Sequence, residues 1–203
     1  TEAVNATEGR IITQNGEAVE AYYFSTSAGV TSTDEIWGSD EAAPYLRSVP
    51  CKFDEEEPWS SWIVELPWKM LEDRIREKGE GTVLRSVTVT RRSESGAATA
   101  LEAVSDKDSC IIENEYEIRK FLAPVNCMIT EKDGTETAGG SLLPSAYFEL
   151  ERTQNGNLQV RGKGYGHGVG MSQTGADKMA EQGYDYREIL DYFFRNITVE
   201  NLG

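Results

Sequence analysis

The sequence predicts an α+β fold, with a mainly antiparallel sheet or barrel-like core and a few packed helices. Stretches with strand character are separated by turn signals such as Asn15-Gly16 and Asn155-Gly156, which are typical of hairpins. Few stretches have helical periodicity, and the 203 residues contain no internal repeat, low-complexity tract or clear linker. Strands joined mostly by hairpin turns favour an antiparallel sheet with helices packed against it.

The strand predictions follow these turn signals along the chain. Apolar and polar residues alternate over residues 82–90, and a turn at 93–96 leads into the next strand. Asp133-Gly134 marks a further turn. The predicted strands cover residues 10–13, 17–24, 82–90, 99–104, 127–130, 147–152 and 158–161.

Four helices are predicted, over residues 67–78, 115–122, 171–182 and 186–194. The first has Pro67 in its first turn and stops at Gly79, which are suitable start and stop residues. The last has an apolar face that includes Ile189 and Phe193, so it is expected to pack against the core. We expect one domain over residues 1–203, with a smaller or inserted lobe at about 58–125.

The charge balance excludes several classes of partner. The chain has 35 acidic and 20 basic residues, a net charge of −15. Nucleic acids and anionic membrane surfaces are bound by clustered Lys and Arg, so neither is an expected partner. No apolar run approaches the ~18 residues of a membrane span. A neutral or polar substrate fits this composition better.

The cysteine and histidine content gives no sign of a metal or other cofactor. The cysteines are sparse and odd in number (Cys51, Cys110 and Cys127), so they form no disulfide framework. A single Cys110–Cys127 disulfide remains an alternative. One histidine, with no paired Cys-x-x-C motif and no H-E-x-x-H motif, does not make a zinc site. We therefore predict no metal and no cofactor.

The most informative segment is residues 162–175, which we call the Gly loop. It holds six of the 19 glycines and the single histidine, His167. Its glycine spacing matches neither the Walker nor the dinucleotide-binding pattern. Two interpretations stay open: a loop that approaches a ligand closely, or a tight crossing of two backbones. His167 is either a structural histidine or, with Tyr165 and Gln173, part of a sugar-binding or proton-handling cluster.

A second polar segment lies near the amino end. Ser25, Thr26 and Ser27, which we call the hydroxyl turn, follow a predicted strand but do not form a G-x-S-x-G nucleophile elbow. They are predicted either to contact substrate or to form a turn held by hydroxyl groups. Glu35 is a candidate glycosidase carboxylate, although most acidic residues of such a chain are solvated. Trp37 is predicted to line the core or a cleft.

Several motifs occur together in the order seen in one known family. They lie at residues 23–31, 35–38, 45–50, 143–145, 162–176 and 186–190. Together they resemble the stage II sporulation protein D family, which includes amidase-enhancer proteins. The resemblance spans nearly the whole chain, and the Gly-His-Gly-Val-Gly-Met-Ser-Gln stretch at 166–173 is its most specific part.

The resemblance implies a bacterial protein that acts on peptidoglycan outside the cytoplasm, with a parent protein that is secreted or anchored through a segment beyond these residues. It implies a lytic transglycosylase that cleaves between N-acetylmuramic acid and N-acetylglucosamine during wall remodelling or engulfment. Glycan strands, a cell-wall amidase and other engulfment proteins are the implied partners. On this basis the hydroxyl turn is expected to face Tyr165, His167 and Gln173 across a substrate groove.

The sequence departs from the family pattern at the catalytic acid. The family's glutamate lies amino-terminal to the hydroxyl turn, in a context that no residue of this chain matches, so the catalytic glutamate is expected upstream of Thr1. The chain therefore resembles the carboxyl-terminal two-thirds of such a domain, with the remaining segment as an expected partner and Glu35 as an in-chain candidate acid. The competing hypotheses are a non-catalytic glycan-binding activator of an amidase and an unrelated β-rich domain.

Overall fold

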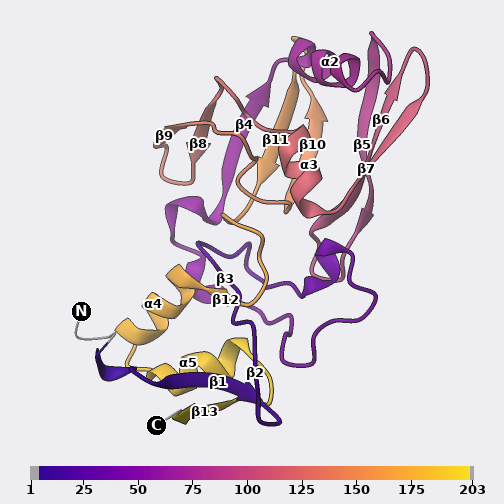
Figure 1. Cartoon of the computed structure of the whole chain (residues 1–203). Coiled ribbons are helices and arrows are strands. Elements are labelled where there is room, and N and C mark those ends of the chain that lie inside the picture. The colour runs from indigo at the N-terminus through magenta and orange to yellow at the C-terminus, as the bar shows by residue number, and fades with distance from the viewer. Residues whose placement is uncertain (1–4, 202–203) are drawn as a thin grey trace.

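A computed structural model describes residues 5–201 of the chain. The elements form two halves (Figure 1). Two sheets and two helices fill the upper half, whereas a small sheet, two helices and a short parallel strand pair make up the lower half. Strands and helices are thus mixed along the chain and most strand pairs are antiparallel, which confirms the predicted α+β class.

The first upper sheet has five antiparallel strands in the order β10-β11-β4-β8-β9. Alternate residues of its central strand β4, such as Val64 and Leu66, are buried, so one face of the strand packs into the core. Gly156 has a φ of 81° in the β10–β11 turn, as the Asn155-Gly156 signal predicts. The strands are β4 (Trp62–Leu66), β8 (Met128–Glu131), β9 (Glu136–Ala138), β10 (Phe148–Arg152) and β11 (Leu158–Gly162).

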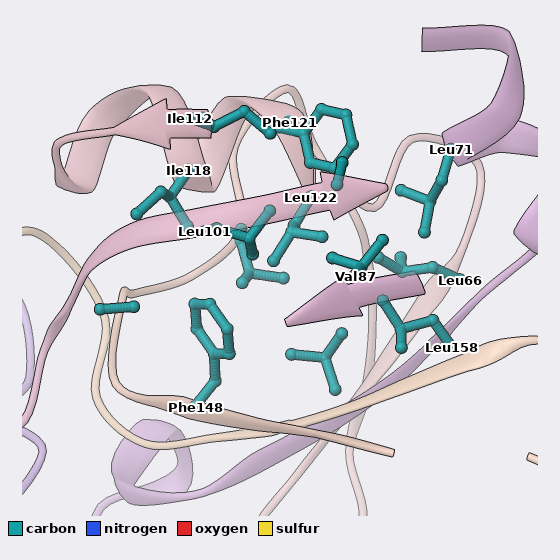
Figure 2. Packing of buried hydrophobic residues seen from close by; sticks show 14 of the residues in the cluster. Leu66, Leu71, Val87, Leu101, Ile112, Ile118, Phe121, Leu122, Phe148 and Leu158 are labelled. Carbon is teal, nitrogen blue, oxygen red and sulfur yellow. The ribbon is translucent and has the colours of Figure 1, made fainter. Parts of the chain in front are cut away.

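The second upper sheet is the antiparallel meander β5-β6-β7. Its strands are β5 (Leu84–Arg92), β6 (Ala98–Ser105) and β7 (Ser109–Glu113), and the helices beside it are α2 (Trp68–Glu77) and α3 (Glu115–Phe121). Side chains from both sheets and both helices meet in one apolar cluster, the first core, which includes Leu66, Leu101, Phe121 and Leu158 (Figure 2).

The lower half is built from the two ends of the described chain. Strand β1 (Arg10–Gln14) pairs with β2 (Glu17–Ala18) and with β13 (Thr198–Asn201). The helices are α4 (Gln173–Glu181) and α5 (Tyr186–Phe193). Ile189, Phe193 and Phe194 of the α5 region are buried in the second core, together with Ile36, Leu46 and Met179. The apolar face predicted for the last helix is thereby confirmed.

Two element predictions are wrong in detail because long-range pairing overrides the local pattern. The strand predicted over residues 17–24 divides into β2 and β3 (Tyr23–Phe24). The helix predicted to start at Met171 starts at Gln173, since Met171–Ser172 forms β12, which pairs in parallel with β3. Strands β4, β7, β9 and β13 were not predicted. Within residues 5–201 the chain also forms three short 3₁₀ segments: η1 (Asp34–Trp37), η2 (Lys52–Asp54) and η3 (Pro58–Ser60).

The first core uses residues from Trp62 to Val160, so it extends past the predicted lobe boundary at residue 125. A separable lobe over 58–125 stays a prediction. Cys51, Cys110 and Cys127 are all free thiols, so Cys110 and Cys127 are not bridged here. Within residues 5–201, none of the helices has the length and apolar character needed to cross a membrane.

Thr1, upstream of which the catalytic glutamate is expected, lies outside the described residues. The position of that glutamate therefore stays a prediction.

Candidate functional site

The hydroxyl turn and the Gly loop lie side by side through direct backbone pairing. Thr26 donates its N–H to the Tyr165 carbonyl at 3.0 Å, and the Tyr165 N–H returns a bond to the Thr26 carbonyl at 2.7 Å. Farther along, the Ser32 N–H reaches the Gly168 carbonyl at 2.6 Å. The structure thus brings together two segments more than 130 residues apart through isolated backbone bridges, and a substrate groove between them stays a prediction.

The glycines of the loop are required by this close approach. A Cβ on Gly170, whose φ is +79°, would lie 2.2 Å from the Tyr22 carbonyl oxygen. A Cβ on Gly164 would lie 2.8 Å from both the Ala28 nitrogen and the Thr26 oxygen. These neighbours are backbone atoms that cannot swing aside. Of the two interpretations of the loop, the tight crossing describes its backbone.

Within the hydroxyl turn, exposure differs from residue to residue. Ser25 is half-buried, whereas Thr26 and Ser27 are only 2% and 1% exposed. The Ser27 hydroxyl donates to the Cys51 carbonyl at 3.3 Å, and its N–H donates to Asp54 at 2.7 Å. The Thr26 and Ser27 hydroxyls are therefore covered by protein in this conformation, and a contact with substrate stays a prediction for all three residues.

Asp54 is the residue of this region that the sequence did not reveal. Its carboxylate is buried and accepts hydrogen bonds from the Ser27 N–H, from the Ser172 hydroxyl at 2.9 Å and from the Thr174 hydroxyl at 2.7 Å. The Cys51 thiol lies 3.4 Å away, and burial followed by the Asp54 charge raises the pKa of that thiol to about 12. A buried charge needs such donors, because an unpaired one is costly to desolvate. Asp54 thus ties the hydroxyl turn to the start of α4.

His167 is half-buried between aromatic rings. Its ring centroid lies 5.2 Å from that of Trp37 and 5.8 Å from that of Phe24. The Val169 N–H donates to His167 Nδ1 at 3.1 Å, which assigns the proton of the neutral ring to Nε2. Burial lowers the pKa of His167. The imidazole is therefore a neutral group that supports the loop, and a role in proton handling stays a prediction.

The other two predicted binding residues are exposed. Tyr165 is 43% exposed and packs edge-on against Trp59, with ring centroids 4.7 Å apart. Gln173 is exposed at the first position of α4, directly after the N-cap Ser172. An aromatic face and an amide are suitable partners for sugar hydroxyls. Tyr165 and Gln173 are accessible to a ligand in a way that Thr26 and Ser27 are not.

Glu35 borders two adjacent clefts. One, of about 520 Å³, is also lined by Trp37, Arg91, Arg92 and Glu113, and we call it the Glu35 cleft. The second, of about 290 Å³, shares Glu35, Ser93 and Glu94 with it. The Glu35 carboxylate is exposed and accepts a bond from the Thr33 hydroxyl at 2.7 Å. Trp37 was predicted to line the core or a cleft, and it does both, because it packs against the second core and lines the Glu35 cleft.

Two buried acids, Glu115 and Asp54, are already engaged. Glu115 is 1% exposed and pairs with Arg119 of the same helix at 2.5 Å, while the Arg119 Nε donates to the Leu143 carbonyl at 2.8 Å. Asp54 is held by its own donors. Glu35 therefore differs from both in being exposed within a cleft. In residues 5–201, no three His, Cys, Asp or Glu side chains are grouped to hold a metal ion.

The sequence of the chain is similar to one family model and to several named proteins. The family described as "Domain of unknown function (DUF8618)" matches residues 47–170. The chain is 31% and 30% identical, over 199 and 200 residues, to "Stage II sporulation protein D" of Bacillus amyloliquefaciens and of Bacillus subtilis. Each alignment covers 98% of this chain and 50% of the relative. The "Amidase enhancer" of Bacillus subtilis is 22% identical over 230 residues, which cover 97% of this chain and 32% of that protein. The chain thus spans about half the length of its sporulation relatives.

Proposed function

The chain belongs to the stage II sporulation protein D family and to the DUF8618 family, and from this membership we propose that it acts on bacterial peptidoglycan outside the cytoplasm. The proposed ligand is the glycan strand. The proposed reaction of the protein that contains this domain is lytic cleavage between N-acetylmuramic acid and N-acetylglucosamine.

The chemistry of that reaction needs only one carboxylic acid. The acid protonates the glycosidic oxygen and then accepts a proton from the muramoyl 6-hydroxyl, which closes a 1,6-anhydro ring. An ordinary glycosidase would need a second carboxylate to activate water or attack the sugar. A cleft with a single suitable acid is therefore sufficient.

The observation that supports this proposal is the pair of adjoining clefts around Glu35. They combine an exposed carboxylate, an aromatic side chain in Trp37, and the hydroxyl of Ser93. Aromatic faces and polar groups of this kind suit saccharide rings.

The catalytic acid itself is proposed to lie upstream of Thr1, in the segment that the family resemblance places before the hydroxyl turn. The buried Asp54 and the ion-paired Glu115 are committed to structural contacts. Glu35 is the in-chain alternative, because its carboxylate faces the clefts.

A second candidate function is a glycan-binding activator of a cell-wall amidase that does not cleave glycan. Two observations favour it. The hydroxyl turn and His167 are held by internal contacts rather than presented to a ligand, and one relative bears the name "Amidase enhancer".

The test is incubation of the 203-residue chain with purified, peptide-free glycan strands, with co-sedimentation for binding and mass spectrometry for 1,6-anhydro ends. We expect binding without product from this chain, and product from a protein that also carries the upstream segment that the family resemblance implies. Glu35→Gln removes the in-chain acid, and Glu136→Gln on β9 is the control with the same charge change at an exposed site away from the clefts.

Each result decides between the proposals. Product from the 203-residue chain that falls about 10²-fold or more with Glu35→Gln, and not with Glu136→Gln, would make Glu35 the acid. Binding without product from either protein would favour the activator. Absence of binding to any glycan strand would refute both.

A further inference from the structure

A third cleft, separate from Glu35, is unusual for its charge. It has a volume of about 260 Å³ and is lined by residues that include Arg92, Ser95, Tyr147, Glu149, Arg161 and Lys163. We call it the Lys163 cleft. Its lining carries three cationic side chains and one carboxylate, Glu149.

This balance is opposite to that of the chain. The whole protein has a net charge of −15, and the Glu35 cleft has three carboxylates against two arginines. A local excess of positive charge on an acidic protein attracts anionic groups selectively, because the rest of the surface repels them.

The three cations differ in how far they are already neutralised. Arg92 is committed to the Phe148 carbonyl at 2.8 Å, to the Gly96 carbonyl at 3.0 Å and to Glu149 at 3.0 Å. Among the described residues, Arg161 forms one ion pair, with its Nε 4.0 Å from Glu151, and both side chains are mostly exposed. Such a pair is worth little in water.

Lys163 has the most available charge. Its side chain is exposed, and its ammonium group makes no hydrogen bond or ion pair within residues 5–201. Its backbone, in contrast, is fixed: the N–H donates to the Tyr147 carbonyl at 2.9 Å, and the carbonyl accepts from the Ser145 hydroxyl at 2.6 Å. A free ammonium on a fixed backbone is well placed to meet an anion.

The Lys163 cleft adjoins the other clefts. It shares Arg92 with the Glu35 cleft. It shares Ala28 and Lys163 with a further cleft of about 330 Å³, whose lining also includes Lys132, Asp54 and Glu55. Arg92 thus lies between the Glu35 cleft and the Lys163 cleft. The walls of the Lys163 cleft also offer hydroxyls, since the Ser95 and Tyr147 hydroxyls lie 3.1 Å apart.

We infer that the Lys163 cleft binds a carboxylate carried by the glycan strand, with Lys163 and Arg161 as its ionic partners. The inference rests on the proposed function, because it names the chemical group that the strand presents. That carboxylate has two sources: the lactyl group of a peptide-free muramic acid, or a stem peptide attached to it.

The test is the dissociation constant of the 203-residue chain for three preparations of glycan: peptide-free strands, the same strands with their carboxylates reduced to alcohols, and strands that keep their stem peptides. Lys163→Gln and Arg161→Gln remove the cations. Lys69→Gln is the matched control, because it makes the same charge change at an exposed side chain of α2, a helix that follows the end of β4 opposite to Lys163.

We expect Lys163→Gln to weaken binding of carboxylate-bearing strands about three- to fivefold, with a larger loss when Arg161→Gln is added. For the reduced strands, wild type and Lys163→Gln are expected to bind equally. The preparation that wild type prefers, peptide-free or peptide-bearing, identifies the source of the carboxylate.

Other outcomes would overturn the inference. Equal binding of native and reduced strands by wild type would show that the protein does not recognise the carboxylates. The proposed function would not be affected. If Lys69→Gln weakened binding as much as Lys163→Gln, the effect would come from the net charge of the protein and not from the Lys163 cleft. A Lys163-dependent preference for a phosphate polymer such as teichoic acid over glycan would assign the cleft to another ligand. Failure to bind any strand would refute the inference and the proposed function together.

Discussion

The two cores of this molecule are held together by different means. The first core is a continuous apolar cluster between two sheets and two helices, and residues such as Leu66 and Leu101 are fully buried in it. The region around the Gly loop depends on backbone pairing, on glycines without room for a side chain, and on the buried carboxylate of Asp54. The region around the Gly loop therefore depends on contacts between segments that lie more than 130 residues apart in the sequence.

The largest expected effect is at the crossing of the Gly loop. Gly170→Ala would place a Cβ 2.2 Å from the Tyr22 carbonyl oxygen in a residue whose φ is +79°. Left-handed backbone strain and overpacking add, so we expect a loss of about 3–5 kcal/mol in the free energy of unfolding. Urea denaturation followed by circular dichroism measures it.

Gly183→Ala is the control for backbone strain alone. Gly183 has a φ of +94°, but nothing lies within 4 Å of the added Cβ. The expected loss is about 1–2 kcal/mol. Similar losses for the two variants would mean that the backbone at the crossing can shift to make room for a side chain. The Gly loop would then not depend on close backbone packing, and its contrast with the first core would be lost.

The polar centre of the same region is expected to give the next largest effect. Asp54→Asn keeps the shape of the side chain but replaces one accepting oxygen with a donor amide, which faces hydroxyl and N–H donors from Ser27, Ser172 and Thr174. We expect a loss of about 2–3 kcal/mol in the free energy of unfolding, since buried donors lose a charged acceptor.

Asp177→Asn on α4 makes the same charge change at an exposed position. It should alter the unfolding free energy by less than about 0.5 kcal/mol. If Asp54→Asn proved as mild as this control, the carboxylate would not be holding the hydroxyl turn to α4.

Sequence patterns predicted the turns and helices that are determined by neighbouring residues. The Asn15-Gly16 turn adopts positive φ values of 53° and 81°, and it joins β1 to β2. Helix α5 has the predicted apolar face, with Ile189 and Phe193 in the core. In each case the signal, a turn dipeptide or a helical period, lies within a few residues of the element that it specifies.

Contacts that depend on distant residues left no such signal. The β3–β12 pair joins Tyr23 to Met171, so neither strand could be recognised from its own neighbours. Asp54 precedes a run of acidic residues, and its burial depends on donors that lie 27 to 120 residues away. The convergence of the hydroxyl turn and the Gly loop was expected from the family resemblance, whereas the burial of Thr26 and Ser27 could be seen only in the structure.

The smallest predicted effect is a pH dependence of the free energy of unfolding that arises from His167. Burial lowers the pKa of His167 from its ordinary value of 6.5; the Glu115 charge acts against this shift and the Arg119 charge adds to it. The unfolded chain therefore binds the proton more tightly than the folded one. Stability from the neutral ring is fully present above about pH 6.5 and is lost as the pH falls from there through the lowered pKa, with a slope below about 1.4 kcal/mol per pH unit.

Because His167 is the single histidine, the measurement is a difference between two proteins. Urea unfolding of wild type and His167→Gln between pH 5 and pH 7.5 should show a slope in wild type that the variant lacks, on top of carboxylate effects common to both. Equal slopes would mean that the imidazole keeps an ordinary pKa and is solvated. The Gly loop would then hold His167 open to a ligand, and its role as a neutral support between Phe24 and Trp37 would have to be given up.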